Sequence, residues 1–141
     1  MRAEGKEPLP KGVRWSLEVM AMIYVAVAVL FVVNPNWPIL VVNKAFMGCN
    51  WPMVFFPTEK FWFCLAVSVP GTRAFLAFAA ARRPVETGLF CVRVLQVSLA
   101  LAATLFAWQF LFHKHAALYA LGFLIESIQV VFYLILNRKL S

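Results

Sequence analysis

Residues 15–33 read WSLEVMAMIYVAVAVLFVV, an apolar run in which Glu18 is the single charged residue. About 20 apolar residues are enough to cross the hydrocarbon core of a membrane as a helix. The apolar region of a secretory signal peptide is only about 7 to 15 residues long and ends at a cleavage site of small residues. This run instead leads into the sequence NPNWP at 34–38. It therefore predicts a retained first transmembrane helix over 15–33.

Three further apolar segments have a similar length. The whole chain is 63% hydrophobic and 13% charged, whereas soluble domains are roughly half apolar and a quarter charged. The composition predicts an all-α integral membrane protein, a bundle of four transmembrane helices. In the second helix, Pro70-Gly71 removes a backbone hydrogen bond and predicts a kink. The predicted spans are 15–33, 59–81, 87–112 and 116–136.

The segments between and around these spans are polar or rich in Trp and Pro. The first outer loop, 34–58, contains the Trp and Pro residues that favour the membrane interface. Within it, 39–47 is apolar but too short to span, which predicts a short helix on the bilayer surface. We expect polar tails at 1–14 and 138–141, on either side of a transmembrane domain at 15–137.

The distribution of Lys and Arg predicts the orientation. The two connections on the side opposite the termini, with their flanking residues, carry only Lys44, Lys60 and Lys114. Cytoplasmic loops carry the excess of basic residues, so we expect both termini in the cytoplasm and a multi-pass protein of the cell (plasma or inner) membrane. The basic residues on the side of the termini are Arg2, Lys6, Lys11, Arg14, Arg82, Arg83, Arg138 and Lys139.

Several classes of function are not supported. The net charge of +7 is scattered among apolar runs, and no nucleic-acid-binding motif is present. Cys49, Cys64 and Cys91 are odd in number and widely spaced, so we expect no disulfide framework or metal site. His113 and His115 lie in one turn and cannot hold a haem from both sides. Since no nucleophile elbow, HExxH or dinucleotide motif occurs, we expect no catalytic residue and no cofactor.

Ionisable residues within the spans are the natural candidates for function, because charge is costly in lipid. Beyond the first two residues of each span, the charged residues are Glu18, Arg73, Arg93 and Glu126. In the structural interpretation, Glu126 pairs with Arg73 or Arg93, and Glu18 pairs with the remaining arginine. These pairs form a polar seam that fixes how the helices pack.

The helix periodicity supports this seam. Tyr119, Gly122, Glu126, Gln129 and Tyr133 are 3, 4, 3 and 4 residues apart and lie on one face of the fourth helix. The third helix has an equivalent small or polar face, and small or polar faces favour helix contact in a membrane. We therefore expect the two faces to meet. The residues of the third-helix face are Arg93, Gln96, Ala100, Ala103 and Ala107. The residues of the whole predicted seam are Glu18, Arg73, Arg93, Gln96, Glu126 and Gln129.

A functional interpretation of the same residues is equally compatible with the sequence. The helices would enclose a cavity in which Glu126 acts as an acid, a base or a ligand, and an arginine holds an anionic or carbonyl-bearing head group. The ligand class would be quinone-, lipid- or sterol-like. The candidate lining residues are Trp108, Gln109, Tyr119 and Tyr133.

The layout resembles DoxX-like small membrane proteins over nearly the whole chain. The likeness rests on Phe61-Trp62, Pro70-Gly71-Thr72-Arg73 and Arg82-Arg83-Pro84. That resemblance implies a four-helix bundle, and some members of the group are membrane subunits of quinone-linked redox enzymes. It implies no catalytic residue for this chain.

Three functions are compatible with these patterns. The first is a non-catalytic accessory or structural subunit that packs against other membrane subunits or against itself. The second is a membrane protein or enzyme, such as an isomerase, that binds a small molecule at Glu126. The third is a channel or transporter, with Pro70-Gly71 as the gate or broken helix, which the lack of an inverted repeat and the few polar lining residues disfavour.

Overall fold

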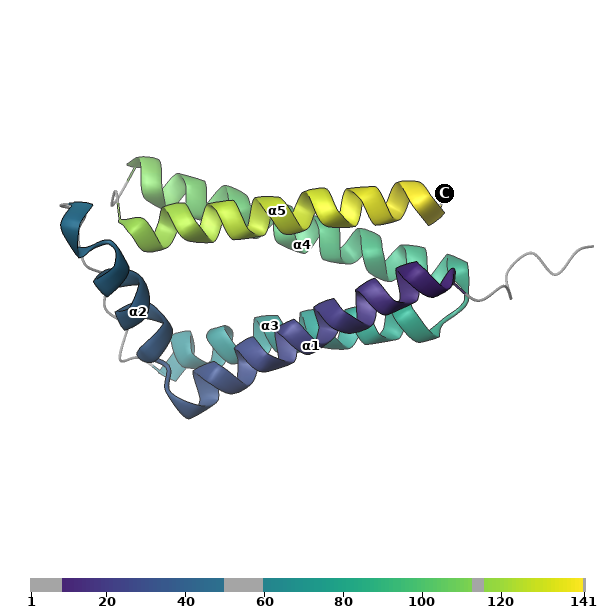
Figure 1. Ribbon diagram of the computed structural model, residues 1–141, viewed down its shortest axis with the longest axis horizontal. Helices are drawn as coiled ribbons and strands as arrows, with labels where there is room; N and C mark the ends of the chain where they lie inside the picture. Colours follow the sequence, from purple (N-terminus) through teal and green to yellow (C-terminus); the bar gives the residue numbers. More distant parts are fainter. Residues whose placement is uncertain (1–8, 50–59, 113–115, 141) are drawn as a thin grey trace, which may run out of the picture.

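The computed structural model describes residues 9–49, 60–112 and 116–140, and these residues form helices joined by short connections (Figure 1). Two elements are short and four are long. Their bounds are α1 Lys11–Val33, α2 Trp37–Ala45, the 3-10 helix η1 Met47–Cys49, α3 Lys60–Arg82, α4 Val85–Phe112 and α5 Ala117–Leu140.

The four long helices are long and apolar enough to cross a membrane: α1, the Cys64–Arg82 part of α3, α4 and α5. The described residues are helical and include four helices long and apolar enough to cross a membrane, which confirms that part of the prediction. Large apolar side chains such as Val33, Phe75 and Leu105 are exposed on these helices. Such surfaces are unfavourable in water and suit the hydrocarbon of a bilayer, which indicates a multi-pass membrane protein.

The helices extend beyond the predicted ends of the spans. At the N-terminal end, α1 begins at Lys11 instead of Trp15, because the buried side chains of Leu9 and Val13 continue the stripe that Leu17 and Ala21 form. Residues 9–14 are therefore not part of a detached tail, while 1–8 lie outside the described residues. At the other end, α5 runs to Leu140 and takes in most of the segment expected as a tail.

The first outer connection contains a short helix, close to the expected 39–47. It begins earlier, at Trp37, because Pro38 fits the first turn of a helix and the Asn34 side chain accepts a hydrogen bond from the Trp37 backbone N–H at 3.2 Å. Figure 1 shows α2 lying across the ends of the long helices, in contact with α1 and α5. Residues 50–59 of the predicted outer loop lie outside the described residues.

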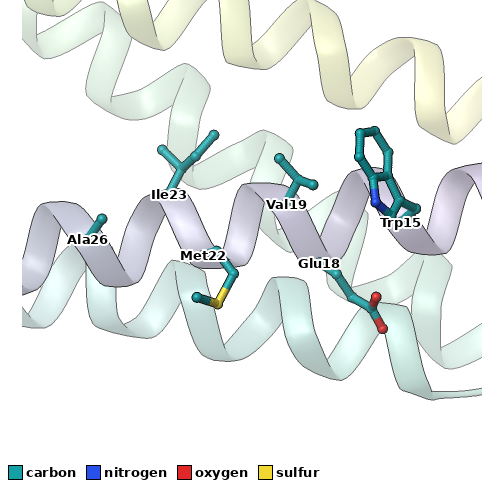
Figure 2. A pocket seen from close by; sticks show the side chains of 6 residues that line it. All are labelled: Trp15, Glu18, Val19, Met22, Ile23 and Ala26. Atoms are coloured by element: carbon teal, nitrogen blue, oxygen red, sulfur yellow. The ribbon is translucent and has the colours of Figure 1, made fainter.

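One shallow depression lies on the surface of α1, with a volume of about 390 Å³. It is formed by one helix and is open on the outside. Figure 2 shows Trp15, Val19 and Ile23 projecting to one side of α1 and Glu18 and Met22 to the other. With Ala26, these residues line the depression. Its apolar character suits a lipid acyl chain better than a polar substrate.

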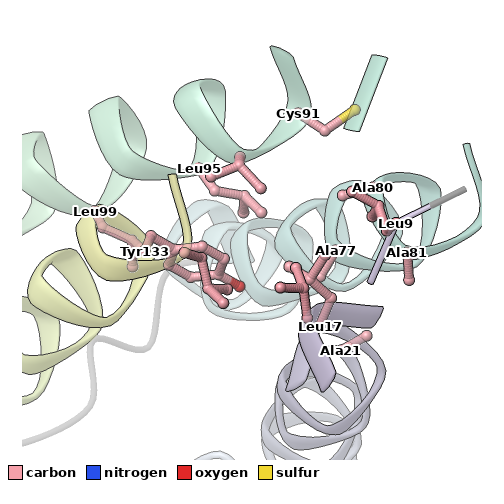
Figure 3. Close-up of a cluster of buried hydrophobic side chains, with 13 residues drawn as sticks. Leu9, Leu17, Ala21, Ala77, Ala80, Ala81, Cys91, Leu95, Leu99 and Tyr133 are labelled. Carbon is pink, nitrogen blue, oxygen red and sulfur yellow. The ribbon is translucent and has the colours of Figure 1, made fainter. Parts of the chain in front are cut away.

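The long helices pack as two pairs, α1 on α3 and α4 on α5, which are joined mainly where α3 meets α4. Small residues on α3, namely Ala77, Ala80 and Ala81, are buried in the common core, where they allow close helix approach. In Figure 3, Tyr133 of α5 lies among Leu95 and Leu99 of α4 and Leu17 of α1. Helix α3 continues through Pro70 as one helix, and the predicted kink stays a prediction.

Two glycines mark close approaches between segments. A Cβ on Gly122 of α5 would lie 2.8 Å from ring carbons of Phe106 on α4, so this ring packs directly on the α5 backbone. A Cβ on Gly88 of α4 would lie 3.1 Å from the Ala80 carbonyl oxygen and 3.4 Å from Leu9. The second approach holds the start of α1 against the α3–α4 turn.

We expect Gly122→Ala to lower the thermal stability of the detergent-solubilised protein, because the Phe106 ring must move to admit the new methyl group. Overpacking of this kind costs about 1 to 3 kcal/mol. Gly71→Ala is the matched control, since no atom lies within 4 Å of a Cβ at that position. The measurement is the unfolding midpoint of each variant in the same detergent. An equal loss of stability at both positions would contradict close packing at Gly122.

Candidate functional site

A buried ion pair joins α3 to α5. The Nη1 of Arg73 donates a hydrogen bond to Oε1 of Glu126 at 2.8 Å, and the two side chains are 8% and 12% exposed. Arg73 lies about 13 Å from the end of α3, at about 1.5 Å per residue, so the pair is well inside a candidate span. Of the two arginines expected as partners of Glu126, the structure pairs it with Arg73.

A second polar bond joins α1 to α5. The hydroxyl of buried Tyr24 donates a hydrogen bond to Oε1 of Gln129 at 2.6 Å. Gln129 follows Glu126 by three residues, so both side chains lie on the same face of α5. Helix α5 therefore receives one bond from α1 and one from α3 on neighbouring turns.

Tyr133 completes this group of residues. Its side chain is fully buried, and it follows Gln129 by one turn of α5. The Tyr133 phenol lies within electrostatic range of Tyr24 and Arg73, and Tyr24 lies within range of both Arg73 and Glu126. We call Tyr24, Arg73, Glu126, Gln129 and Tyr133 the polar cluster.

The polar cluster has unused hydrogen-bonding capacity. Arg73 Nε and Glu126 Oε2 are buried, and neither has a hydrogen-bond partner among the described residues. The same holds for Nε2 of Gln96 on α4. The buried Tyr133 hydroxyl lies beside the Tyr24 hydroxyl but makes no hydrogen bond of good geometry there. A buried polar atom without a partner costs about 1 to 3 kcal/mol. The cluster is thus able to bond to a further polar group.

Two predicted members of the polar seam lie elsewhere. Glu18 pairs with Arg14, one turn earlier on α1, where Arg14 Nε lies 3.1 Å from Glu18 Oε1. The expected pair of Glu18 with Arg93 is therefore wrong. Arg93 is exposed on α4, because the buried stripe of that helix is made of apolar or small residues. The buried residues of α4 are Gly88, Cys91, Val92, Leu95, Leu99 and Ala103.

The face predicted for the third helix, α4, therefore points only partly into the bundle. Arg93 and Ala100 are exposed, while Gln96 and Ala107 are half-buried. The predicted α5 face is the one that turns inward, with Tyr133 buried and Glu126 and Gln129 half-buried. Tyr24 was missing from the predicted site. A signal for it was present, because it follows Leu17 and Ala21 at helical spacing and is the polar member of that buried stripe.

The predicted pocket residues differ in their burial, and a shared pocket for them stays a prediction. Tyr133 joins the polar cluster, whereas Trp108 is exposed and stacks on Phe112 with ring centroids 4.4 Å apart. Gln109 and Tyr119 are half-buried, and no hydrogen bond of Tyr119 to the polar cluster occurs among the described residues. The depression on α1 contains no member of the cluster.

The described residues contain no group of three or more His, Cys, Asp and Glu placed to hold a metal ion. Cys64 and Cys91 are free thiols, exposed and buried respectively. The side chains of Cys49, His113 and His115 lie outside the part of the chain that the structure describes. The chemistry that the described site supports is hydrogen bonding and charge pairing at the polar cluster.

No family model, curated protein or solved structure matches this chain. The resemblance to DoxX-like proteins, and the functions it implies, therefore stay predictions. The features that point to a function are the exposed Arg93 and the buried Arg73–Glu126 pair.

We expect Arg73→Met to destabilise the bundle by about 3 to 5 kcal/mol, because it leaves the Glu126 carboxylate buried without its partner. The double variant Arg73→Met/Glu126→Leu removes both charges and should recover most of that loss. The measurement is the free energy of unfolding in mixed micelles titrated with SDS. A double variant no more stable than Arg73→Met would show that the ion pair is not what the single substitution disrupts.

Proposed function

We propose that this chain is a non-catalytic accessory or structural subunit of a larger membrane complex, and that α4 is the helix that docks. The partner is another integral membrane protein that supplies an Asp or Glu within its own span. The observation that supports this proposal is the exposed position of Arg93.

Arg93 lies on an exposed stripe of α4 that has Glu86 in its first turn and is otherwise apolar from Phe90 to Leu101. Phe90, Val97 and Leu101 are exposed on the same side, at separations of three, four and four residues that keep them on one helix face. Arg93 is itself exposed, about 12 Å from the start of α4 at about 1.5 Å per residue. The stripe combines apolar contact surface with one fixed positive charge.

An unpaired arginine on a lipid-facing surface is energetically unfavourable. Placing Arg at the centre of a membrane helix costs about 2.5 to 3.5 kcal/mol on insertion scales, and less towards the end of a helix, where the side chain extends to the interface; such residues almost always pair. Among the described residues, the two carboxylates in ion pairs are Glu18 and Glu126, and both are bonded to other arginines. A partner carboxylate at the same depth would remove this cost. It would also fix the depth at which the two proteins dock.

The same stripe is suited to helix packing in other respects. Ala100 is exposed next to Leu101, and small residues let a second helix approach closely. The resemblance to DoxX-like proteins, some of which are membrane subunits, agrees with this role. We propose no reaction for this chain.

We further propose that both termini lie in the cytoplasm and that the host membrane is the cell membrane. Figure 1 shows the start of α1, the α3–α4 turn and the C-terminus at the same end of the molecule. Lys11, Arg14, Arg82, Arg83 and the last-turn residues of α5 bring positive charge to this end. Positive charge is retained on the cytoplasmic side.

We expect Arg93→Glu to abolish the recovery of a stoichiometric partner after gentle solubilisation, since it opposes the partner's carboxylate with a like charge. Arg93→Lys keeps the charge and should retain the partner. The measurement is native mass spectrometry, together with photo-crosslinking from position 97 on the stripe and from position 128 on α5 as a control. The identified partner's intramembrane acid, changed to Lys, should restore binding to Arg93→Glu.

Equal crosslinking from both positions would count against the proposal, and so would a mass spectrum in which Arg93→Glu keeps the same partner. If the wild-type protein carries only phospholipid, and crosslinks from position 97 reach lipid alone, then Arg93 binds a lipid phosphate and the subunit role is wrong.

The proposed orientation predicts that green fluorescent protein fused after Ser141 is fluorescent and that alkaline phosphatase fused there is inactive, when both fusions are expressed in bacteria. The phosphatase folds only outside the cytoplasm, whereas the fluorescent protein matures inside it. Fusions placed in the α4–α5 connection should give the opposite pair of results. Active phosphatase at the C-terminus would reverse the proposed orientation.

A further inference from the structure

The unpartnered atoms of the polar cluster differ in what they require from a ligand. Arg73 Nε carries a hydrogen and needs an acceptor, whereas Glu126 Oε2, as a carboxylate oxygen, needs a donor. Both atoms are buried and belong to the same ion pair. The Tyr133 hydroxyl lies beside that of Tyr24, which already donates to Gln129, and is able to donate or accept. The group that satisfies these needs is one that both donates and accepts, as a hydroxyl does.

The net charge of the cluster selects against ionic ligands. The charges of Arg73 and Glu126 cancel within their 2.8 Å contact. An anionic head group would approach Glu126 as closely as it approaches Arg73, and a cationic head group would meet the reverse conflict. An uncharged polar group suffers neither repulsion.

The surroundings limit the ligand further. Because the two side chains of the pair are only 8% and 12% exposed, the head group must be small. Next to Glu126 along α5, Phe123 and Ile125 expose apolar side chains. The remainder of a ligand whose head reaches Glu126 would therefore lie against apolar surface, in the region open to lipid.

We propose that the polar cluster binds the hydroxyl head group of an uncharged, lipid-soluble molecule, such as a long-chain alcohol or a monoacylglycerol. The hydroxyl donates to Glu126 Oε2 and accepts from Arg73 Nε, and the Tyr133 phenol bonds to the same oxygen or to a second one on the head group. No bond is made or broken in this binding. The site is distinct from the exposed face of α4 on which the proposed partner docks, so either proposal can fail without the other.

The test uses three probes with the same acyl tail and different head groups: oleyl alcohol, oleate and oleylamine. Each is titrated into the full chain in detergent, at a pH where the acid and the amine are ionised, and binding is followed by the shift of the unfolding temperature. We expect saturable binding of oleyl alcohol, and at least tenfold weaker binding of the two ionic probes. Tyr133→Phe should weaken oleyl alcohol binding about five- to tenfold.

Tyr119→Phe is the matched control, because it removes the same hydroxyl from another turn of α5 and should leave the affinity unchanged. Extraction of the purified protein and mass spectrometry of its lipids provides a second readout. We expect a neutral hydroxyl lipid to be enriched with the wild-type chain relative to Tyr133→Phe.

Three results would overturn the proposal. Equal affinity for all three probes would mean that the tail alone binds to apolar surface. Unchanged oleyl alcohol affinity in Tyr133→Phe would place the alcohol elsewhere. The lack of any saturable binding, with ordered water found at Arg73 Nε and Glu126 Oε2 in an experimental structure, would show that water completes the cluster.

Discussion

The ion pair between Arg73 and Glu126 is the constraint on which the arrangement of the helices depends. Removing either charge from water is costly, and in lipid the cost is tolerable only if the opposite charge is in direct contact. The 2.8 Å contact meets this condition. Since α3 belongs to one helix pair and α5 to the other, the requirement for charge pairing is also a requirement that the two pairs remain together.

Apolar packing and polar bonding have separate roles in this molecule. Small residues permit close contact within the pairs and where α3 meets α4, as with Gly122 against the Phe106 ring and Gly88 against Ala80. Between the pairs, α1 and α3 reach α5 through the longer side chains of Tyr24 and Arg73. Lipid offers little hydrophobic driving force for association of helices. The polar bonds therefore supply specificity where close packing is sparse.

The sequence was sufficient to predict the four long helices and the α5 residues of the polar cluster. Length and hydropathy predict the four spans because a membrane requires both, and the spacing of Glu126, Gln129 and Tyr133 predicts that they share a face. The sequence did not distinguish Arg73 from Arg93, because that choice depends on how α3 and α4 are rotated about their axes. Helix α4 carries apolar residues on every side, so hydropathy hardly separates its buried Leu95 and Leu99 from exposed residues such as Val97 and Leu101. The start of α1 was missed because Leu9 is buried by a contact with Gly88, far away in the sequence.

Both interhelical bonds of the polar cluster end on α5, which is synthesised after α1 and α3. Tyr24 and Gln129 are separated by 105 residues, and Arg73 and Glu126 by 53. Chains are made from the N-terminus at about 5 to 20 residues per second, so α1 and α3 leave the ribosome seconds before their bonding partners. During that interval the charge of Arg73 has no carboxylate from α5 to neutralise it. Arrival of α5 is therefore the step of biogenesis at which both of these interhelical bonds can form.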